Sequence, residues 1–177
     1  MSALAGKKVN ESVTVMTEMV MPNDTNPMGN LMGGNLMRWM DIAGSVCAGK
    51  HTESHVVTAS VDHLAFQKPI HNGDIVTLEA RVVRSFNTSL EVYVEVFAHD
   101  IKGGNPRRCN HAYFTFVGLD DITMKPKPIH PVIPLSNEEM KQYEGSLRRR
   151  ELRLILSGKL KPEDAVEIKS LFEVKNA

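Results

Sequence analysis

Three central segments of the chain alternate apolar and polar residues, and no other feature constrains the fold as strongly. They are DIVTLEARVV (74–83), SLEVYVEVF (89–97) and CNHAYFTFVGL (109–119). In the first, Val76 and Leu78 face one side and Thr77 the other, because successive side chains of a strand point in opposite directions. Each segment therefore predicts a strand with one covered and one wetter face, as is typical of an antiparallel sheet.

Two further segments complete the predicted sheet. Residues 12–21 are rich in Val, Thr and Met, and residues 56–66 form a less regular strand. A tight hairpin at 86–88 joins the third strand to the fourth, whereas 101–108, with its two glycines, indicates a looser connection. The sheet thus has five strands.

Residues 34–49 change to a helical spacing. Leu36, Met40, Ala43 and Cys47 recur at steps of three and four residues and form one apolar stripe. This helix is the only long element before the tail that can cover the apolar face of the sheet. We therefore predict an α+β hot-dog fold, in which a five-stranded antiparallel sheet wraps around one central helix, with a C-terminal helical extension.

The chain divides into three parts. Residues 1–124 form the hot-dog domain, and residues 125–135 carry four prolines in KPKPIHPVIP and form an extended linker. Residues 136–177 form the helical extension, which opens with a capping box of Ser136 and Glu139. A sheet of this size leaves its edges exposed, so we expect at least a homodimer.

Composition excludes several classes of function. Lys+Arg and Asp+Glu both number 21, so no overall charge recruits nucleic acid or a membrane surface. The sequence shows no signal-peptide pattern and no membrane-spanning segment, and Cys47 and Cys109 suit reduced thiols, so we expect a cytoplasmic protein. The seven histidines match no metal-binding spacing, and we expect no metal.

One acidic residue, Asp41, stands in the apolar helix run NLMRWMDIAG. It follows the glycine-rich helix start at Gly33 and Gly34 by about two turns. Unpaired amides of a first helical turn can polarise a carbonyl oxygen, and a carboxylate can act as base or nucleophile, which together resemble half of an acyl-transfer site. The alternative is an exposed Asp41 paired with Arg38.

Four stretches of the sequence together resemble the hot-dog acyl-CoA thioesterases, specifically bacterial hydrolases related to brain-type acyl-CoA hydrolase. They are DTNPMGNLMGGNLMRWMDIAG, VVTASVDHLAFQKPIHNGDIV, TSLEVYVEV and HAYFTFVGLD, in that order. The resemblance covers about residues 10–120 and leaves the tail outside. It implies hydrolysis of acyl-CoA to a carboxylic acid and coenzyme A, with no separate cofactor.

The resemblance also implies roles for individual residues. The helix carboxylate of the family falls on Asp41, as general base or nucleophile, and its loop asparagine falls on Asn26, which orients water or thioester. The amides of Gly33 and Gly34 polarise the thioester carbonyl. Asn26 of one subunit serves Asp41 of the other, in a dimer that assembles further into a trimer of dimers. Met32 replaces a residue that is more often aromatic, which points to an altered acyl-chain preference.

The phosphates of coenzyme A need local cations or hydrogen-bond donors. Candidates flank strand ends and loops, although each also suits a solvated surface. They are Lys68, Arg84, Asn87, Thr88, Ser89, Arg107 and Arg108.

Two other functions fit the same fold. A non-catalytic acyl-CoA-binding or sensing module would need an effector domain, for which the tail is short. A hot-dog dehydratase would need a histidine with the helix carboxylate, and no histidine occupies the predicted helix 34–49. His63 is a candidate for a strand histidine or a catalytic one. Fold alone does not choose among these functions.

Overall fold

A computed structural model describes residues 4–62, 64 and 66–172 of the chain. The chain separates into two compact units, Met1–Ile133 and Pro134–Ala177. The boundary between them falls inside the predicted linker 125–135.

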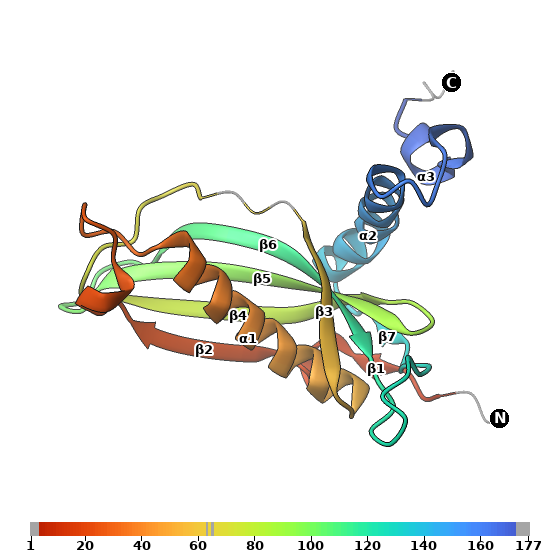
Figure 1. The fold of residues 1–177 in the computed structure, drawn as a ribbon, viewed down its shortest axis with the longest axis horizontal. Helices are drawn as coiled ribbons and strands as arrows, with labels where there is room; N and C mark the ends of the chain where they lie inside the picture. Colours follow the sequence, from red (N-terminus) through yellow and green to blue (C-terminus); the bar gives the residue numbers. More distant parts are fainter. Residues whose placement is uncertain (1–3, 63, 65, 173–177) are drawn as a thin grey trace. The chain divides into compact units, whose positions relative to one another are not determined.

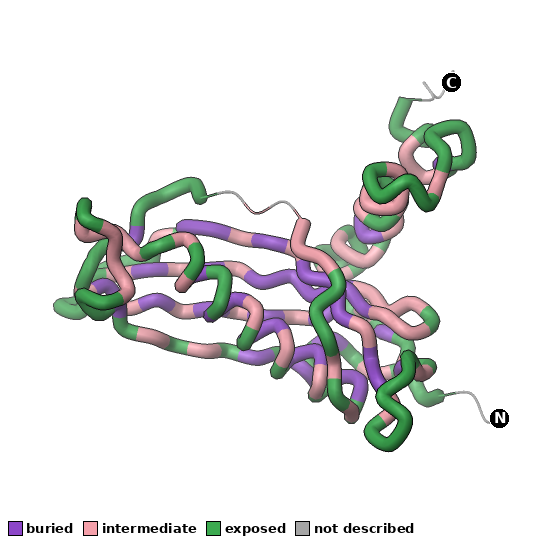
Figure 2. Tube along the Cα trace, viewed as in Figure 1, coloured by how far each residue is buried: buried purple, intermediate pink, exposed green. Residues whose placement is uncertain are grey.

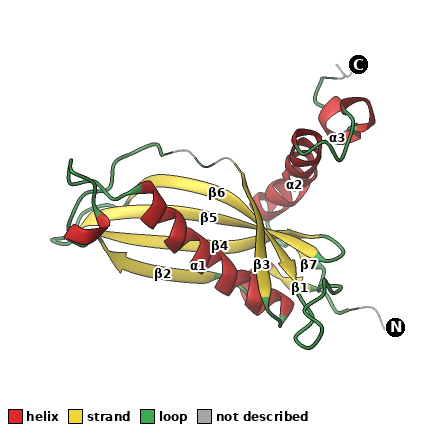
Figure 3. Ribbon diagram, viewed as in Figure 1, coloured by secondary structure: helices red, strands yellow, loops and turns green. Residues whose placement is uncertain are grey.

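The first unit contains the predicted five-stranded antiparallel sheet (Figures 1 and 3). The strands lie in the order β2-β4-β5-β6-β3, so that β2 and β3 form the two edges. Their bounds are β2 Thr14–Met19, β3 Val56–Asp62, β4 Asp74–Ser85, β5 Ser89–Asp100 and β6 Arg107–Gly118. The hot-dog fold predicted from the alternation is therefore confirmed.

Helix α1 spans Gly33–Thr52 and crosses the inner face of the sheet (Figure 1). Its predicted apolar stripe is buried, with Met40, Ala43 and Cys47 fully inaccessible. Figure 2 shows the matching alternation of buried and half-buried residues along β4. Burial of apolar surface in this contact stabilises the fold by about 25 cal/mol per Å².

Gly44 lies on the side of α1 that faces the sheet. A Cβ atom at this position would stand 3.0 Å from Cζ of Phe116. The absence of a side chain thus lets the helix approach the sheet closely.

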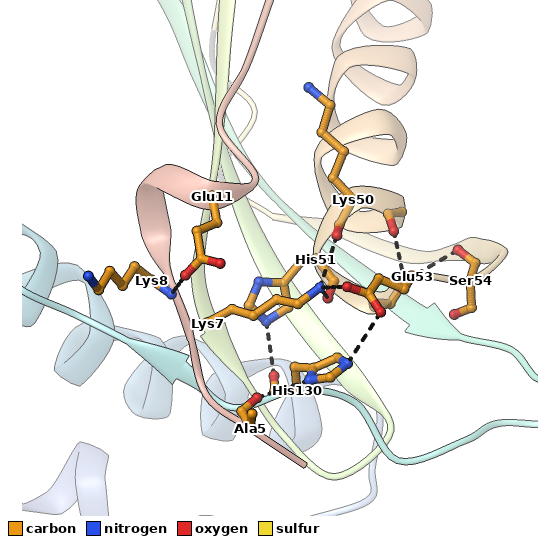
Figure 4. Close-up of polar contacts among 11 residues, drawn as sticks. Ala5, Lys7, Lys8, Glu11, Lys50, His51, Glu53, Ser54 and His130 are labelled. Carbon is orange, nitrogen blue, oxygen red and sulfur yellow. Dashed lines mark hydrogen bonds and ion pairs between the residues drawn. The ribbon is translucent and has the colours of Figure 1, made fainter.

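Hydrogen bonds and an ion pair from the N-terminal segment hold the C-terminal end of α1 in place (Figure 4). Lys7 Nζ donates to the carbonyl oxygen of His51 at 2.9 Å and forms an ion pair with Glu53 at 2.6 Å. His51 is fully buried, and its Nε2 donates to the carbonyl oxygen of His130 at 2.9 Å. His130 Nδ1 in turn lies 2.9 Å from the carbonyl oxygen of Ala5. These contacts join three segments that are distant in the sequence.

The proline-rich segment packs on the first unit over much of its length. The amide of Lys127 donates to Gly118 O and that of Ile129 to Asn87 O. Two short strands, β1 Lys7–Lys8 and β7 Val132–Ile133, then pair in parallel. Only the residues after Ile133 belong to the second unit.

The second unit consists of the 20-residue helix α2 (Asn137–Leu156) followed by shorter helical turns. The predicted capping box is present, because Ser136 Oγ accepts from the amide of Glu139 and Glu139 accepts from the amide of Ser136. The short helices are η3 Pro162–Asp164 and α3 Val166–Lys169, and in the first unit η1 Val9–Glu11 and η2 Pro22–Asp24.

We expect the buried His51 to make the fold acid-sensitive. Burial, together with the positive charges of Lys7 and His130, lowers the pKa of His51 below its usual 6.5, although the hydrogen bond to His130 O and the charge of Glu11 oppose this shift. The unfolded chain then binds more protons, so stability falls as the pH drops below about 6.5, by at most about 1.4 kcal/mol per pH unit.

The variant His51→Gln keeps a donor near the position of Nε2 but does not titrate. Denaturant unfolding between pH 7.5 and 5.5 should show a flatter pH dependence for this variant than for the wild type. The same pH dependence of stability in the two proteins would show that His51 is not the cause of the acid sensitivity.

Candidate active site

The loop before α1 is shaped by two acceptor side chains. Asp24 Oδ2 accepts from the amide of Met21 at 3.0 Å. Asn26 Oδ1 accepts from the amides of Met28 at 3.0 Å and Asn30 at 3.1 Å. Among the described residues, no partner is found for the side-chain amide of Asn26, so its two donor hydrogens remain available to a ligand or another subunit.

Helix α1 begins with unpaired amides. Within the described part of the chain, the amides of Gly33 and Gly34 donate no hydrogen bond to the backbone, as is expected for a first helical turn. The two glycines differ in their surroundings. A Cβ atom at Gly33 would stand 2.8 Å from Cζ of Phe66, whereas a Cβ atom at Gly34 would meet nothing within 4 Å. The backbone of Gly34 therefore borders open space, whereas that of Gly33 packs against the Phe66 ring.

Asp41 is half-buried on α1 and is held by a threonine of the edge strand β3. Thr58 Oγ1 donates to Asp41 Oδ1 at 2.6 Å. No other hydrogen bond or ion pair to Asp41 is found among the described residues, and Arg38 is not its partner. The alternative of a surface pair with Arg38 is therefore wrong, and one carboxylate oxygen is oriented while the other stays available.

Thr58 is the residue of the site that the sequence analysis missed. Its strand contains a β-bulge, because Thr58 pairs with Phe116 while Ser60 already pairs with Thr115. Bulges redirect side chains and are frequent beside active sites. The signal in the sequence is the irregular alternation of VVTASVDHLAF (56–66). His63 lies outside the described residues.

A cleft of about 360 Å³ lies beside the start of α1. One wall comes from the helix start and the other from the segment that leads into β4. The lining residues are Asn30, Leu31, Gly33, Leu36, Phe66, Gln67, Lys68, Pro69 and Ile70. Lys68 is thus the one predicted cation that lines this cleft.

Two other predicted cations are held by the protein itself. Arg107 forms an ion pair with the buried Asp74, and its guanidinium also donates to the carbonyl oxygen of Pro69 at 3.4 Å. Arg108 Nε lies 2.5 Å from Glu95 Oε1, and its Nη2 donates to Tyr93 OH at 2.6 Å. Both arginines therefore have a structural role on the sheet.

The hairpin candidates lie at the opposite end of the sheet. Arg84, Asn87, Thr88 and Ser89 surround the β4–β5 turn, where the carbonyl oxygen of Thr88 accepts from Gly118 and Arg84 lies over the Phe86 ring at 5.9 Å. Strand β4 separates this turn from Lys68 by about 35 Å. Within one protomer, the predicted set of coenzyme A ligands therefore does not form one site.

Comparisons with known proteins agree with this geometry. A family model described as the thioesterase superfamily matches residues 28–104. The uncharacterized acyl-CoA thioester hydrolase YkhA of Bacillus subtilis is 37% identical over 139 residues, which cover 78% of this chain and 80% of the relative. A solved apo-hexameric acyl-CoA thioesterase has a TM-score of 0.83 and 34% identity, covering 87% of this chain and 98% of that chain.

A second solved structure, acyl-CoA hydrolase from Staphylococcus aureus, was obtained in complex with butyryl coenzyme A, coenzyme A and coenzyme A disulfide. It has a TM-score of 0.79 and 34% identity, covering 94% of this chain and 99% of that chain. Further structures of this enzyme carry alanine in place of an asparagine, an aspartate 15 residues later and a threonine 17 residues after that.

The fold and the matches together define a thioesterase of the hot-dog class. The chain belongs to the acyl-CoA thioester hydrolases of the thioesterase superfamily. None of the described helices is long and apolar enough to cross a membrane. The described residues also contain no group of three or more His, Cys, Asp or Glu side chains that could hold a metal ion.

We expect Thr58 to position Asp41 for thioester hydrolysis. Thr58→Val removes the hydroxyl donor with little change of shape, and Thr58→Ser keeps it. Because a hydrogen bond to a charged group contributes about 1.5–3 kcal/mol, kcat should fall roughly 10- to 100-fold in the valine variant and stay near wild type in the serine variant. Equal rates of thiol release for Thr58→Val and wild type would show that Thr58 does not contribute to hydrolysis.

Proposed function

We propose that this protein hydrolyses acyl-CoA thioesters to a free carboxylic acid and coenzyme A, with Asp41 as the central catalytic residue. The observation that carries the proposal is the 2.6 Å hydrogen bond between Thr58 Oγ1 and Asp41 Oδ1. A carboxylate that is oriented by one fixed donor, with its second oxygen open, is arranged to take a proton or attack a carbon. An ordinary surface aspartate has no need of such a partner.

The chemistry needs few groups because a thioester is already activated by its thiolate leaving group. Asp41 accepts a proton from water, whose oxygen attacks the carbonyl carbon. Donors at the start of α1 stabilise the negative charge on the carbonyl oxygen, and the C–S bond then breaks. Direct attack by Asp41 would instead form an anhydride that water hydrolyses. Labelled solvent oxygen in the carboxylate of Asp41 after a single turnover would mark this second route.

The donors and the base come from different subunits in this proposal. Asp41 lies about 12 Å along α1 from Gly33, which is too far for both to contact one carbonyl group. The amides of Gly33 and Gly34, together with Asn26, therefore serve the Asp41 of the partner subunit. The available amide of Asn26 suits the orientation of water or thioester at that shared site.

The surface beside Asp41 supports a homodimer. Apolar side chains on α1 and β3 are exposed in the protomer: Met37 by 37%, Ile42 by 40%, Val46 by 45% and Val57 by 47%. The outer edge of β3 is also unpaired within the described chain. Pairing of two such surfaces would bury apolar area and protect the strand edge. The hexameric relative supports a further assembly into a trimer of dimers.

The S. aureus relative supports the assignment of the site residues. Its asparagine, aspartate and threonine that were replaced by alanine have the same spacing as Asn26, Asp41 and Thr58. The contacts of the coenzyme A moiety with Lys68, Arg84, Asn87, Thr88 and Ser89 stay predictions.

Removal of the carboxylate tests the proposal directly. Thiol release from a panel of C2 to C18 acyl-CoAs should be measured for wild type, Asp41→Ala and the similarly shaped Asp41→Asn. Both variants should lose at least about 100-fold in kcat, because each lacks the positioned base. Their unfolding transitions should match the wild type, since Asp41 is not part of the core. Full activity in either variant would show that Asp41 is not the catalytic residue.

A mixed dimer tests whether the site is shared. Asn26→Ala and Asp41→Ala chains, each inactive alone, are co-expressed with different tags. A heterodimer then contains one site with both residues intact, and random pairing should restore roughly a quarter of wild-type activity. A site within one protomer would give no recovery.

A non-catalytic acyl-CoA-binding module remains the alternative function. It predicts saturable binding without turnover at every chain length. The Thr58–Asp41 contact favours hydrolysis, because binding alone gives no reason to orient a carboxylate.

A further inference from the structure

The cleft at the start of α1 has a wall that is built around one aromatic ring. Phe66 is 58% exposed, yet its ring lies over the backbone of Gly33. Any side chain at position 33 would collide with it, since a Cβ atom would stand 2.8 Å from Cζ of the ring. The absence of a side chain at residue 33 therefore lets Phe66 occupy the wall next to the unpaired amides.

The opposite part of the cleft is held in place by hydrogen bonds. The amide of Leu31 donates to Ile70 O at 2.8 Å, and Asn30 forms a β-bridge with His71. Arg107 binds both Asp74 and the carbonyl oxygen of Pro69. These contacts fix the Ile70 side and leave the exposed ring of Phe66 as the adjustable side. Figure 1 shows the segment before β4 at the same end of the sheet as the start of α1.

The lining chemistry suits a hydrocarbon chain. Five of the nine lining residues carry apolar side chains: Leu31, Leu36, Phe66, Pro69 and Ile70. A cleft of about 360 Å³ has room for several methylene groups of an acyl chain. An acyl chain needs no hydrogen-bond partner and can pack on these five apolar side chains.

We propose that this cleft receives the acyl chain of the substrate and that Phe66 sets the preferred chain length. The inference rests on the proposed function, in which the amides of Gly33 and Gly34 bind the thioester carbonyl. An acyl chain that leaves this carbonyl meets the Phe66 ring beside Gly33. Met32, which the sequence analysis singled out for chain preference, is not one of the residues that line the cleft.

Variants of Phe66 that widen or narrow the cleft test the proposal. The ratio of kcat/KM for dodecanoyl-CoA to that for butyryl-CoA is measured for Phe66→Ala, Phe66→Trp and wild type. Phe66→Ala should raise the ratio at least about tenfold and Phe66→Trp should lower it, because changes of one methylene in an apolar pocket alter rates by 10-fold or more. Phe172→Ala, which removes a 78% exposed ring in the second unit, is the matched control and should leave the ratio unchanged.

A second pair of variants displaces the Phe66 ring by adding a side chain at position 33. Gly33→Ala should displace Phe66 and change the ratio, and the double variant Gly33→Ala/Phe66→Ala should return to the ratio of Phe66→Ala alone. Independent effects of the two substitutions would contradict the packing of ring on glycine.

The outcomes separate the two proposals. If wild type turns over no acyl-CoA, the proposed function fails. If wild type is active but the ratio is the same in all Phe66 variants, the hydrolase assignment stands and the cleft does not hold the acyl chain. A loss of the dimer in gel filtration, with the ratio unchanged, would show instead that Phe66 contacts a second copy.

Discussion

Burial of one face of α1 against the inner face of the sheet is the interaction on which the rest of the structure depends. It places Met40, Ala43 and Cys47 in the core and fixes the rotation of the helix about its axis. Because 3.6 residues complete a turn, the position of Asp41 follows from this rotation. The carboxylate lies at the border between the core and the exposed surface, where Thr58 on the edge strand can reach it.

The same packing leaves the opposite face of the helix and the edge of β3 uncovered. Ile42, Val46 and Val57 are exposed in the protomer, although they are apolar. In one protomer, Asp41 lies in the middle of α1, about 12 Å from the amides at the helix start, so neither group alone makes a complete acyl-transfer site. This separation along α1 is the reason for proposing a site that two copies share.

Alternation predicted the three central strands and the 3.6-residue period predicted the central helix, because the spacing of apolar residues matches the geometry of these elements. Residue type predicted the other two strands, and the capping box of Ser136 and Glu139 predicted the tail helix. Thr58 could not be predicted, since a β-bulge breaks the pattern by which strand residues are assigned to faces. Arg107 and Arg108 were predicted as ligands of coenzyme A because a sequence shows a cation but not its partner, and the fold supplies Asp74 and Glu95 as partners.

By itself, the sequence determined the fold class, the family resemblance and the choice of Asp41, Asn26 and the two helix-start glycines as candidates. These depend on local spacing and on residue type. Only the tertiary structure decided which threonine orients Asp41, which arginines are held in ion pairs, and why Gly33 has no side chain. Each of these depends on a contact between residues that are far apart in the chain, and hydrophobic periodicity carries no information about such contacts.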